Sequence, residues 1–329
     1  MNSTIQSSSL VRGVLPWIAV ACVSLEVLLP CAEAAGWPEK PIRFVVGASP
    51  DVLPRLVGQK LADVWGQQIV VDQRPGAGGI IAAELVAKAP ADGYTWLLST
   101  GAYTTLSGLY PRLPYDFVRD LAPVTLMATI PFALVVHPSV AANSVQDFIK
   151  LARSRPGQLN YGSGGNGTTS HLAGEMFKSM AKVEIVHVPY KGVPAAVIDL
   201  IGGQVQMMFA VMQSALPHVK AGRLRALAVT SARRTSSAPD LPTIAESGVP
   251  GYEFISWNAV HVPAGTTKPV TRTIRDEIVK VLALPDVKER MFGLGLETAS
   301  STPEQLGELV RSDIAKWSKV IKEAGVKAD

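Results

Sequence analysis

Short apolar runs alternate with longer amphipathic segments along almost the whole chain, and this alternation restricts the fold more than any other feature. Near the start, three runs have the length and composition of buried strands, at residues 42–46, 68–71 and 95–99. The segments between them repeat apolar residues at helical spacing, as in residues 51–66. The pattern therefore predicts βαβ units and a parallel sheet covered by helices.

A second array of strands and helices is inserted into the first. It opens with the apolar run at residues 131–139, after which Ser144 is placed to cap a helix with Asp147 in its first turn. A similar apolar segment returns at residues 257–265. Two crossings that enclose a middle block predict an α/β fold of two lobes with a ligand cleft between them. We assign residues 35–133 and 258–329 to the first lobe and residues 134–257 to the second.

The C-terminal helix is the most clearly delimited element. Thr302 is placed as its N-cap, Pro303 as its first residue, Gln305 as the partner in a capping box, and Gly325 as its end. One apolar face runs between these signals, formed by Leu306, Leu309, Val310, Ile314, Trp317 and Ile321. We expect a long helix that packs on the first lobe.

The first 34 residues have the features of a cleavable export signal. A single arginine precedes an apolar stretch at residues 13–25, which is too short to span a bilayer, and an A-x-A pattern ends at Ala34. Both cysteines, Cys22 and Cys31, lie in this leader, so the mature chain would contain no disulfide and no thiolate ligand. Pro30 does not suit a lipoprotein box. The sequence therefore predicts a periplasmic protein without a lipid anchor.

The charge of the chain argues against nucleic-acid partners. The formal net charge is +4, and the basic residues form no stripe interleaved with aromatic residues, which nucleic-acid binding would require. A weak positive field favours the capture of small anions instead.

The segment NYGSGGNGTTSH at residues 160–171 contains the pattern G-x-G-x-x-G. A dinucleotide site would need an acidic residue at the end of the next strand, whereas the only acid there, Glu184, stands at its start. We therefore expect no cofactor. The hydroxyls of Thr168, Thr169 and Ser170 and the exposed amides of a helix start favour a carboxylate instead. An ordinary N-cap behind a glycine-rich turn is the alternative.

Catalytic motifs are sparse. The chain has no G-x-S-x-G, no H-E-x-x-H and no closely spaced histidine pair. Ser170 and His171 are adjacent and would be the acid–base pair of a hydrolase, but no acid is evident to orient the imidazole. We therefore expect a binding protein, with no catalytic residue and no metal, and keep the hydrolase as the rival class.

Several longer segments occur in a fixed order from Trp37 to the C-terminus: WPEKPIRFVVG, DQRPGAGG, DGYTWLLST, LYPRLPYD, PGQLNYGSGGNGTTSHLAGEMFK, HVPYKG, DLIGGQVQMMF, ALPHVKAGRLRALAVTS and LPTIAESGVPGYE. Together they resemble the Bug proteins, the extracytoplasmic substrate-binding components of the tripartite tricarboxylate transporter group. The resemblance implies a type II periplasmic-binding-protein fold with a two-stranded hinge. It also implies a small di- or tricarboxylate or aromatic acid as ligand, held by backbone amides, hydroxyls and waters.

The resemblance also implies which positions contact the ligand and which proteins receive it. The ligand positions lie in four loops and are Ala48, Ser49, Ser99, Thr100, Gly101, Ala102, Gly165, Asn166, Gly167, Thr168, Thr169, Ser170 and Ala210. The receiving partner would be the permease subunits of a tripartite transporter or a sensor kinase. The protein itself would act as a monomer.

Two departures from the family pattern concern the ligand. The first strand runs through residues 47–50 directly to Asp51, without the paired glycines that are usual there, although Asp51 is still placed to cap the following helix. Many relatives have an aspartate directly after the residue matching Phe209, where this chain has Ala210. This difference predicts a ligand without an amino group. If the shortened loop disables the cleft, the protein would be a non-binding relative that is retained for protein contacts.

Overall fold

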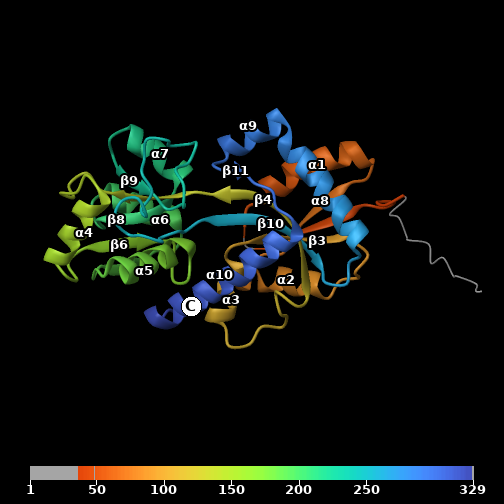
Figure 1. The fold of residues 1–329 in the computed structure, drawn as a ribbon, viewed down its shortest axis with the longest axis horizontal. Helices are drawn as coiled ribbons and strands as arrows, with labels where there is room; N and C mark the ends of the chain where they lie inside the picture. The colour runs from red at the N-terminus through yellow and green to blue at the C-terminus, as the bar shows by residue number, and fades with distance from the viewer. Residues whose placement is uncertain (1–35, 48, 328–329) are drawn as a thin grey trace, which may run out of the picture. The chain divides into compact units, whose positions relative to one another are not determined.

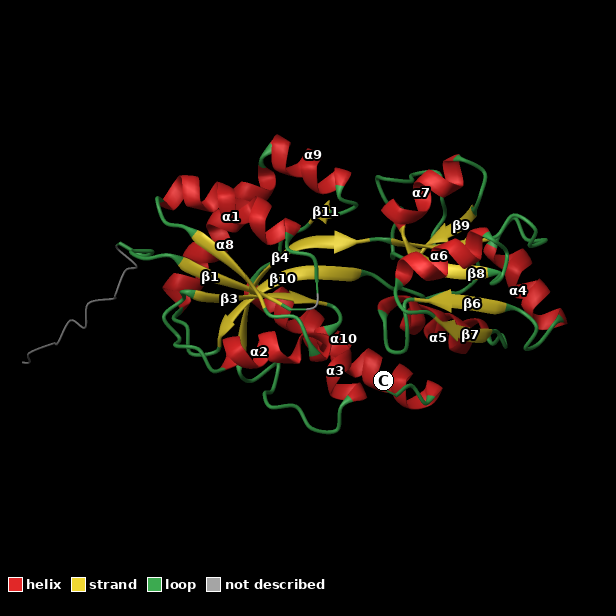
Figure 2. Cartoon of the chain, turned by 180° about the vertical axis from the view of Figure 1, so that it is seen from behind, coloured by secondary structure: helices red, strands yellow, loops and turns green. Residues whose placement is uncertain are grey.

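The computed structural model describes residues 36–47 and 49–327 (Figure 1). The predicted signal peptide and both cysteines lie outside the described residues. The described part is a mixed α/β structure with two sheets (Figure 2), and both sheets belong to one compact unit that begins at Gly36. We call the parts built on the larger and the smaller sheet the first and the second lobe.

The larger sheet has six strands and is formed by the two ends of the described chain. Its members are β1 (Ile42–Val46), β2 (Ile69–Gln73), β3 (Thr95–Thr100), β4 (Leu121–Ile130), β10 (Ser256–Pro263) and β11 (Glu297–Thr298), in the spatial order β11-β4-β10-β3-β1-β2. The smaller sheet has five strands, in the order β7-β6-β8-β5-β9. They are β5 (Phe132–Val136), β6 (Asn160–Ser163), β7 (Val186–Pro189), β8 (Met207–Val211) and β9 (Arg225–Val229).

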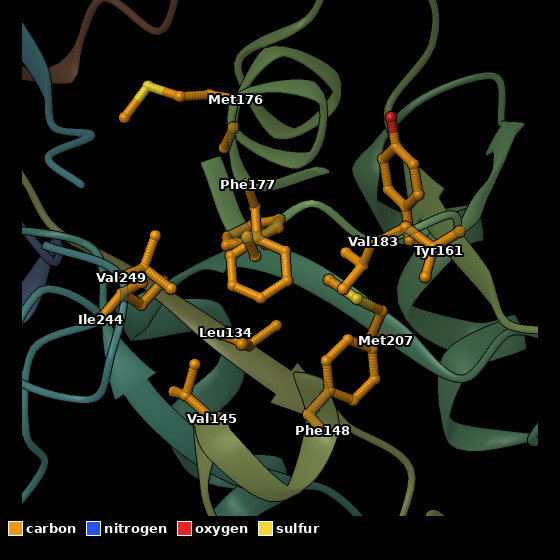
Figure 3. Packing of buried hydrophobic residues seen from close by; sticks show 14 of the residues in the cluster. Leu134, Val145, Phe148, Tyr161, Met176, Phe177, Val183, Met207, Ile244 and Val249 are labelled. Atoms are coloured by element: carbon orange, nitrogen blue, oxygen red, sulfur yellow. The ribbon is translucent and has the colours of Figure 1, made fainter. Parts of the chain in front are cut away.

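Helices cover both faces of each sheet. On the first lobe, one face carries α1 (Val52–Trp65), α8 (Lys268–Ala283) and α9 (Pro285–Gly293), and the other carries η1 (Ala77–Gly79), α2 (Ile80–Ala87), α3 (Tyr103–Leu109) and α10 (Pro303–Ala324) (Figure 1). On the second lobe, α4 (Val145–Ser154) and α5 (Thr169–Ala181) cover one face, and α6 (Val193–Ile201) and α7 (Met212–Lys220) cover the other. Figure 3 shows the first of these two cores, in which Phe148 of α4 and Phe177 of α5 pack against Leu134 of β5.

The parallel sheet that the sequence predicts is only partly present. Strand β1 is parallel to β2 and β3, and β6 is parallel to β7 and β8, whereas β10 is antiparallel to β3 and β4, and β5 is antiparallel to β8 and β9. The antiparallel strands are the ones that carry the chain from one sheet to the other and back. Strand β4 carries Pro123, which argues against a strand from sequence alone. Strand β11 pairs with β4 only at Ala128 and Thr129, so this side of β4 is an open sheet edge at Pro123. Proline has no backbone N–H group to donate, and at an open edge no neighbouring strand requires one.

Two connections join the sheets. Only Pro131 separates β4 from β5, and a longer segment leads from the end of β9 at Val229 to the start of β10 at Ser256. Within the described part of the chain, no helix is both long enough and apolar enough to cross a membrane.

Helix α10 confirms the predicted capping signals and corrects the predicted packing. The Thr302 hydroxyl accepts a hydrogen bond from the Gln305 amide at 3.2 Å, and the Gln305 side chain accepts one from the Thr302 amide at 2.9 Å. The prediction that this helix packs on the first lobe was incomplete, because Trp317 and Ile321 belong to the core of the second lobe. The helix has 22 residues and so is about 33 Å long, which lets it reach both lobes.

Candidate functional site

The predicted ligand loops follow the carboxyl ends of neighbouring parallel strands. In the first lobe, Val46 of β1 pairs with Leu98 of β3, so the loops that follow these two strands lie at the same edge of the sheet. In the second lobe, the parallel strands β6 and β8 likewise place the glycine loop and the start of α7 at one edge. This edge is where ligands bind in open α/β sheets.

A cavity of about 410 Å³ lies at these loops and contains residues of both lobes. It brings together four of the predicted ligand residues, Ser49, Thr100 and Ala102 from the first lobe and Thr169 from the second. We call it the Ser49 cavity. Its volume lies in the range of small-molecule sites, which is about 300–1,000 Å³.

The side chains around the Ser49 cavity are all uncharged. Ser256 and Asn258 of β10 add two polar groups to the hydroxyls already named. The rest of the wall is apolar and comes from the start of α1, the end of β4 and the segment after α9, through Pro50, Val52, Leu53, Ile130, Leu294 and Leu296. The cavity can therefore offer neutral hydrogen-bond donors at one part of a ligand and apolar contact to the rest.

The loop after β1 contributes a hydroxyl that has no partner. The Ser49 Oγ atom is shielded from solvent and makes no hydrogen bond within the described residues. The prediction that the Asp51 side chain caps α1 is wrong. Asp51 occupies the N-cap position of α1 without a side-chain cap bond, because its carboxylate accepts a hydrogen bond from Arg55 Nε at 2.7 Å instead. Ala48, which was also predicted to contact the ligand, lies outside the described residues.

The three hydroxyls at the start of α5 have different roles. Thr168 Oγ1 donates to the carbonyl oxygen of Gly165 at 2.7 Å, and Ser170 Oγ accepts from the amide of Gly164 at 3.1 Å. These two hydroxyls hold the glycine loop in place, and Thr169 between them lines the Ser49 cavity. Thr168 occupies the N-cap position of α5, but its side chain makes no capping hydrogen bond. Its hydroxyl therefore does not serve as the ordinary helix cap that was the alternative explanation.

Several other predicted residues lie beside the cavity or away from it. Ser99 is fully buried, and its hydroxyl donates to the Ala259 carbonyl at 3.2 Å and lies 2.7 Å from Nδ1 of His261. Ala210 is buried in the core of the second lobe. Gly101 lines a much smaller space that also touches Thr169 and Ser256. Gly165, Asn166, Gly167 and Thr168 form the loop before Thr169, and Ser170 follows it in α5; none of these five residues lines the cavity.

The predicted ligand residues leave eight of the lining residues out, and four of these eight show why sequence reasoning missed them. Ser256 and Asn258 are two positions apart on β10, so they point to the same face, and this face is evident only once the neighbours of β10 are known. Leu294 and Leu296 follow α9, far along the chain from the other lining residues, and no motif marks them.

The surroundings of His171 do not form a serine–histidine pair. Its Nδ1 atom accepts a hydrogen bond from the Gly167 amide at 3.0 Å, and its Nε2 atom lies 3.9 Å from Oε1 of Glu175. An acid is therefore present, but the second ring nitrogen faces a backbone amide and not the Ser170 hydroxyl, as nucleophilic catalysis would require. Among the described residues, no cluster of three or more histidine, cysteine, aspartate and glutamate side chains is arranged to hold a metal ion.

Comparisons with known proteins agree with this architecture. Residues 53–326 match the model of the tripartite tricarboxylate transporter family receptor. A UPF0065 protein from the tcbD-tcbE intergenic region of Pseudomonas sp. (strain P51) is 41% identical over 323 residues, which are 97% of this chain and 96% of that protein. BugT of Bordetella pertussis is 35% identical over 301 residues, which are 90% of this chain and 92% of BugT.

A solved structure gives the same result for the fold. R. palustris Rpa4515 with adipate is 38% identical, with a TM-score of 0.74 over 88% of this chain and 99% of that chain. This similarity and the two-sheet architecture confirm the fold class that the sequence predicts.

Proposed function

The chain belongs to the tripartite tricarboxylate transporter receptor family, and from this membership we propose that it captures a small organic carboxylate in the Ser49 cavity and delivers it to a membrane permease. The observation that carries the proposal is the composition of the cavity wall. Hydroxyls from both lobes, at Ser49, Thr100 and Thr169, meet an apolar surface in a space of about 410 Å³. Hydroxyl donors suit a carboxylate, and the apolar wall suits the carbon skeleton that bears it.

The proposal extends to the class of ligand. Among the described residues, the cavity wall offers no carboxylate that would pair with an ammonium group. This feature supports an aliphatic or aromatic acid without an amino group. The similar R. palustris protein with adipate makes a dicarboxylate of this kind the first ligand to test.

We include the remaining sequence expectations in the same proposal. The protein would be exported by a signal peptide over residues 1–34, would act as a monomer in the periplasm, and would have no catalytic activity. The permease of a tripartite tricarboxylate-type transporter is the proposed recipient, and a sensor kinase is the alternative recipient.

The experiment that tests the proposal is a thermal-shift screen of the purified mature protein. The panel contains adipate, shorter and longer dicarboxylates, tricarboxylates, aromatic acids, aspartate and glutamate. A ligand at about 100 times its dissociation constant stabilises the folded state by about 2.7 kcal/mol, which raises the melting temperature measurably. We expect stabilisation by an acid without an amino group. Preferential stabilisation by aspartate or glutamate would contradict the proposed class.

A matched pair of variants locates the binding site. The Ser49→Ala variant removes the unpartnered hydroxyl in the cavity, and Ser154→Ala removes an exposed hydroxyl at the end of α4. We expect the first change to weaken binding of the acid found in the screen about tenfold, as for the loss of one hydrogen bond, and the second to have no effect. If no acid stabilises ligand-free protein, the shortened loop after β1 has disabled the cavity, and the protein is a non-binding relative.

A further inference from the structure

A buried histidine, His171, and a partly buried one, His187, are stacked directly behind the glycine loop. The rings of His171 in α5 and His187 in β7 are 3.8 Å apart between centroids and are inclined by only 6°. His171 is 6% exposed, and the ring of Tyr161 in β6 lies 4.9 Å from His187 and 6.4 Å from His171. The three rings therefore form one packed group beneath the loop that precedes α5.

Each imidazole holds a different part of the loop. His171 Nδ1 accepts a hydrogen bond from the Gly167 amide at 3.0 Å. His187 Nε2 lies 2.6 Å from Ser163 Oγ, which in turn bonds both the amide and the carbonyl group of Gly165 at 3.1 Å. Gly165 and Gly167 have φ angles of 127° and 70°, which favour glycine, so this loop has a specific backbone path that these contacts maintain.

The loop in turn positions the start of α5. The Gly165 carbonyl accepts the hydrogen bond of the Thr168 hydroxyl at 2.7 Å, and Thr168 is the N-cap of the helix. The next residue, Thr169, lines the Ser49 cavity. A continuous series of contacts therefore leads from the histidine pair to the Ser49 cavity, although neither histidine lines it.

The contacts of His171 define where a proton must bind. Because Nδ1 accepts an amide hydrogen, the neutral ring carries its hydrogen on Nε2, on the side of Glu175. A further proton can then bind only at Nδ1, where it would point at the Gly167 N–H group and break that hydrogen bond. The loop therefore cannot keep its observed path when the His171 ring is protonated.

The charged and titratable neighbours of the pair come from three elements. Glu175 of α5 is 8% exposed and accepts hydrogen bonds from Lys178 Nζ at 2.7 Å and from the Tyr161 hydroxyl at 2.6 Å. In Figure 3 this hydroxyl points out of the apolar core. Oε1 of Glu175 faces Nε2 of His171, and Lys178 partly offsets the charge of this carboxylate. Burial, followed by the neighbouring His171, lowers the pKa of His187 to about 4, so both rings do not carry protons together at neutral pH.

We propose that His171 and His187 are positioning residues for the glycine loop, and that protonation of this stacked pair opens the loop and weakens ligand binding in acid. The inference rests on the proposed function, because it takes the Ser49 cavity as the ligand site. Neither residue is assigned to contact with the ligand. Their role is to set the position of Thr169 through the loop.

The test uses variants that keep the hydrogen bonds but cannot take a proton. In His171→Asn, the side-chain oxygen replaces Nδ1 as the acceptor for Gly167, and in His187→Gln, the side-chain amide replaces Nε2 opposite Ser163. The double variant combines both changes. His171→Leu removes the acceptor at every pH, and His137→Asn changes a histidine that bonds Ser139 outside the loop and serves as the matched control.

The first readout follows the loop without any ligand. The backbone amide resonance of Gly167 is recorded by NMR between pH 7.5 and pH 4 in the full mature protein, because the pKa of His187 is about 4. We expect this resonance to shift with pH in the wild type and in His137→Asn, to stay constant in the double variant, and to be displaced already at pH 7.5 in His171→Leu. A Gly167 resonance that does not respond to pH in the wild type would overturn the proposal.

The second readout is the affinity for adipate over the same pH range. Adipate itself takes up protons there, so the wild type is compared with the double variant at each pH. We expect the ratio of the affinity at pH 7.5 to the affinity at pH 4 to be about tenfold larger in the wild type than in the double variant, as for the loss of one hydrogen bond. A parallel decline in both proteins would overturn the coupling to the ligand. A pH-sensitive Gly167 resonance in a protein that binds no acid would support the proton-sensitive loop and contradict the proposed function.

Discussion

Replacement of Trp317 by alanine tests whether α10 stabilises both lobes. Trp317 is 3% exposed and lies in the core of the second lobe, where its ring packs edge-on against Phe254 with 5.3 Å between centroids. Removing a buried tryptophan costs about 3–5 kcal/mol, because the apolar contacts are lost and a cavity remains. This is a large part of the free energy of unfolding of a typical protein, about 5–15 kcal/mol.

The effect is measured by urea unfolding followed by far-UV circular dichroism, since the substitution removes a tryptophan and would distort a fluorescence signal. With an m-value of about 3 kcal/mol per M, the expected loss lowers the midpoint by about 1 M or more. The control is Lys319→Ala in the same helix, because the Lys319 side chain is 75% exposed. A midpoint in Trp317→Ala that matches that of Lys319→Ala would refute the view that α10 holds the second lobe.

Three further changes test other parts of the structure by the same urea assay. The pKa of His261 is lowered to about 3 by burial, so its neutral form stabilises the fold above about pH 6.5, and between pH 7 and pH 5 the wild type should lose about 2 kcal/mol that His261→Asn does not lose. In Gly174→Ala, the added methyl group would lie 2.3 Å from the Tyr161 ring and should cost about 1–3 kcal/mol, whereas Gly202→Ala, with ordinary contacts, should be nearly neutral. Thr302→Ala removes the cap of α10 and should cost about 1 kcal/mol, and an unchanged midpoint would show that the capping box is not stabilising.

Local sequence patterns predicted structure well where neighbouring residues alone decide the outcome. The caps at Thr302 and Ser144 are confirmed, and the Asp147 amide donates to Ser144 Oγ at 3.1 Å. The cap at Asp51 failed because Arg55, one turn further on, competes for the same carboxylate. Strand β4 was missed because the pattern of a single strand does not show that Pro123 lies at a sheet edge.

The candidate site was predictable to the level of its loops but not of every side chain. The resemblance to the Bug proteins implied Ser49, Thr100 and Thr169 as ligand positions, and these three residues line one cavity. Parallel strands bring the loops that follow them to one edge of a sheet, which places Ser49 beside Thr100. Ser99 and Thr100 are adjacent on β3, so their side chains point to opposite faces of the sheet. Ser99 is therefore buried, whereas Thr100 lines the cavity. Leu296 comes from a segment distant in sequence and carries no local signal.

The uncharged wall of the Ser49 cavity has an electrical consequence for delivery. If an acid binds there as proposed, no basic side chain among the described wall residues would lie beside it to offset its charge locally. The field of that added charge is felt over distances of about 8 Å at physiological salt. A membrane partner that docks near the mouth of the cavity would therefore meet a surface whose potential reports whether the receptor is full.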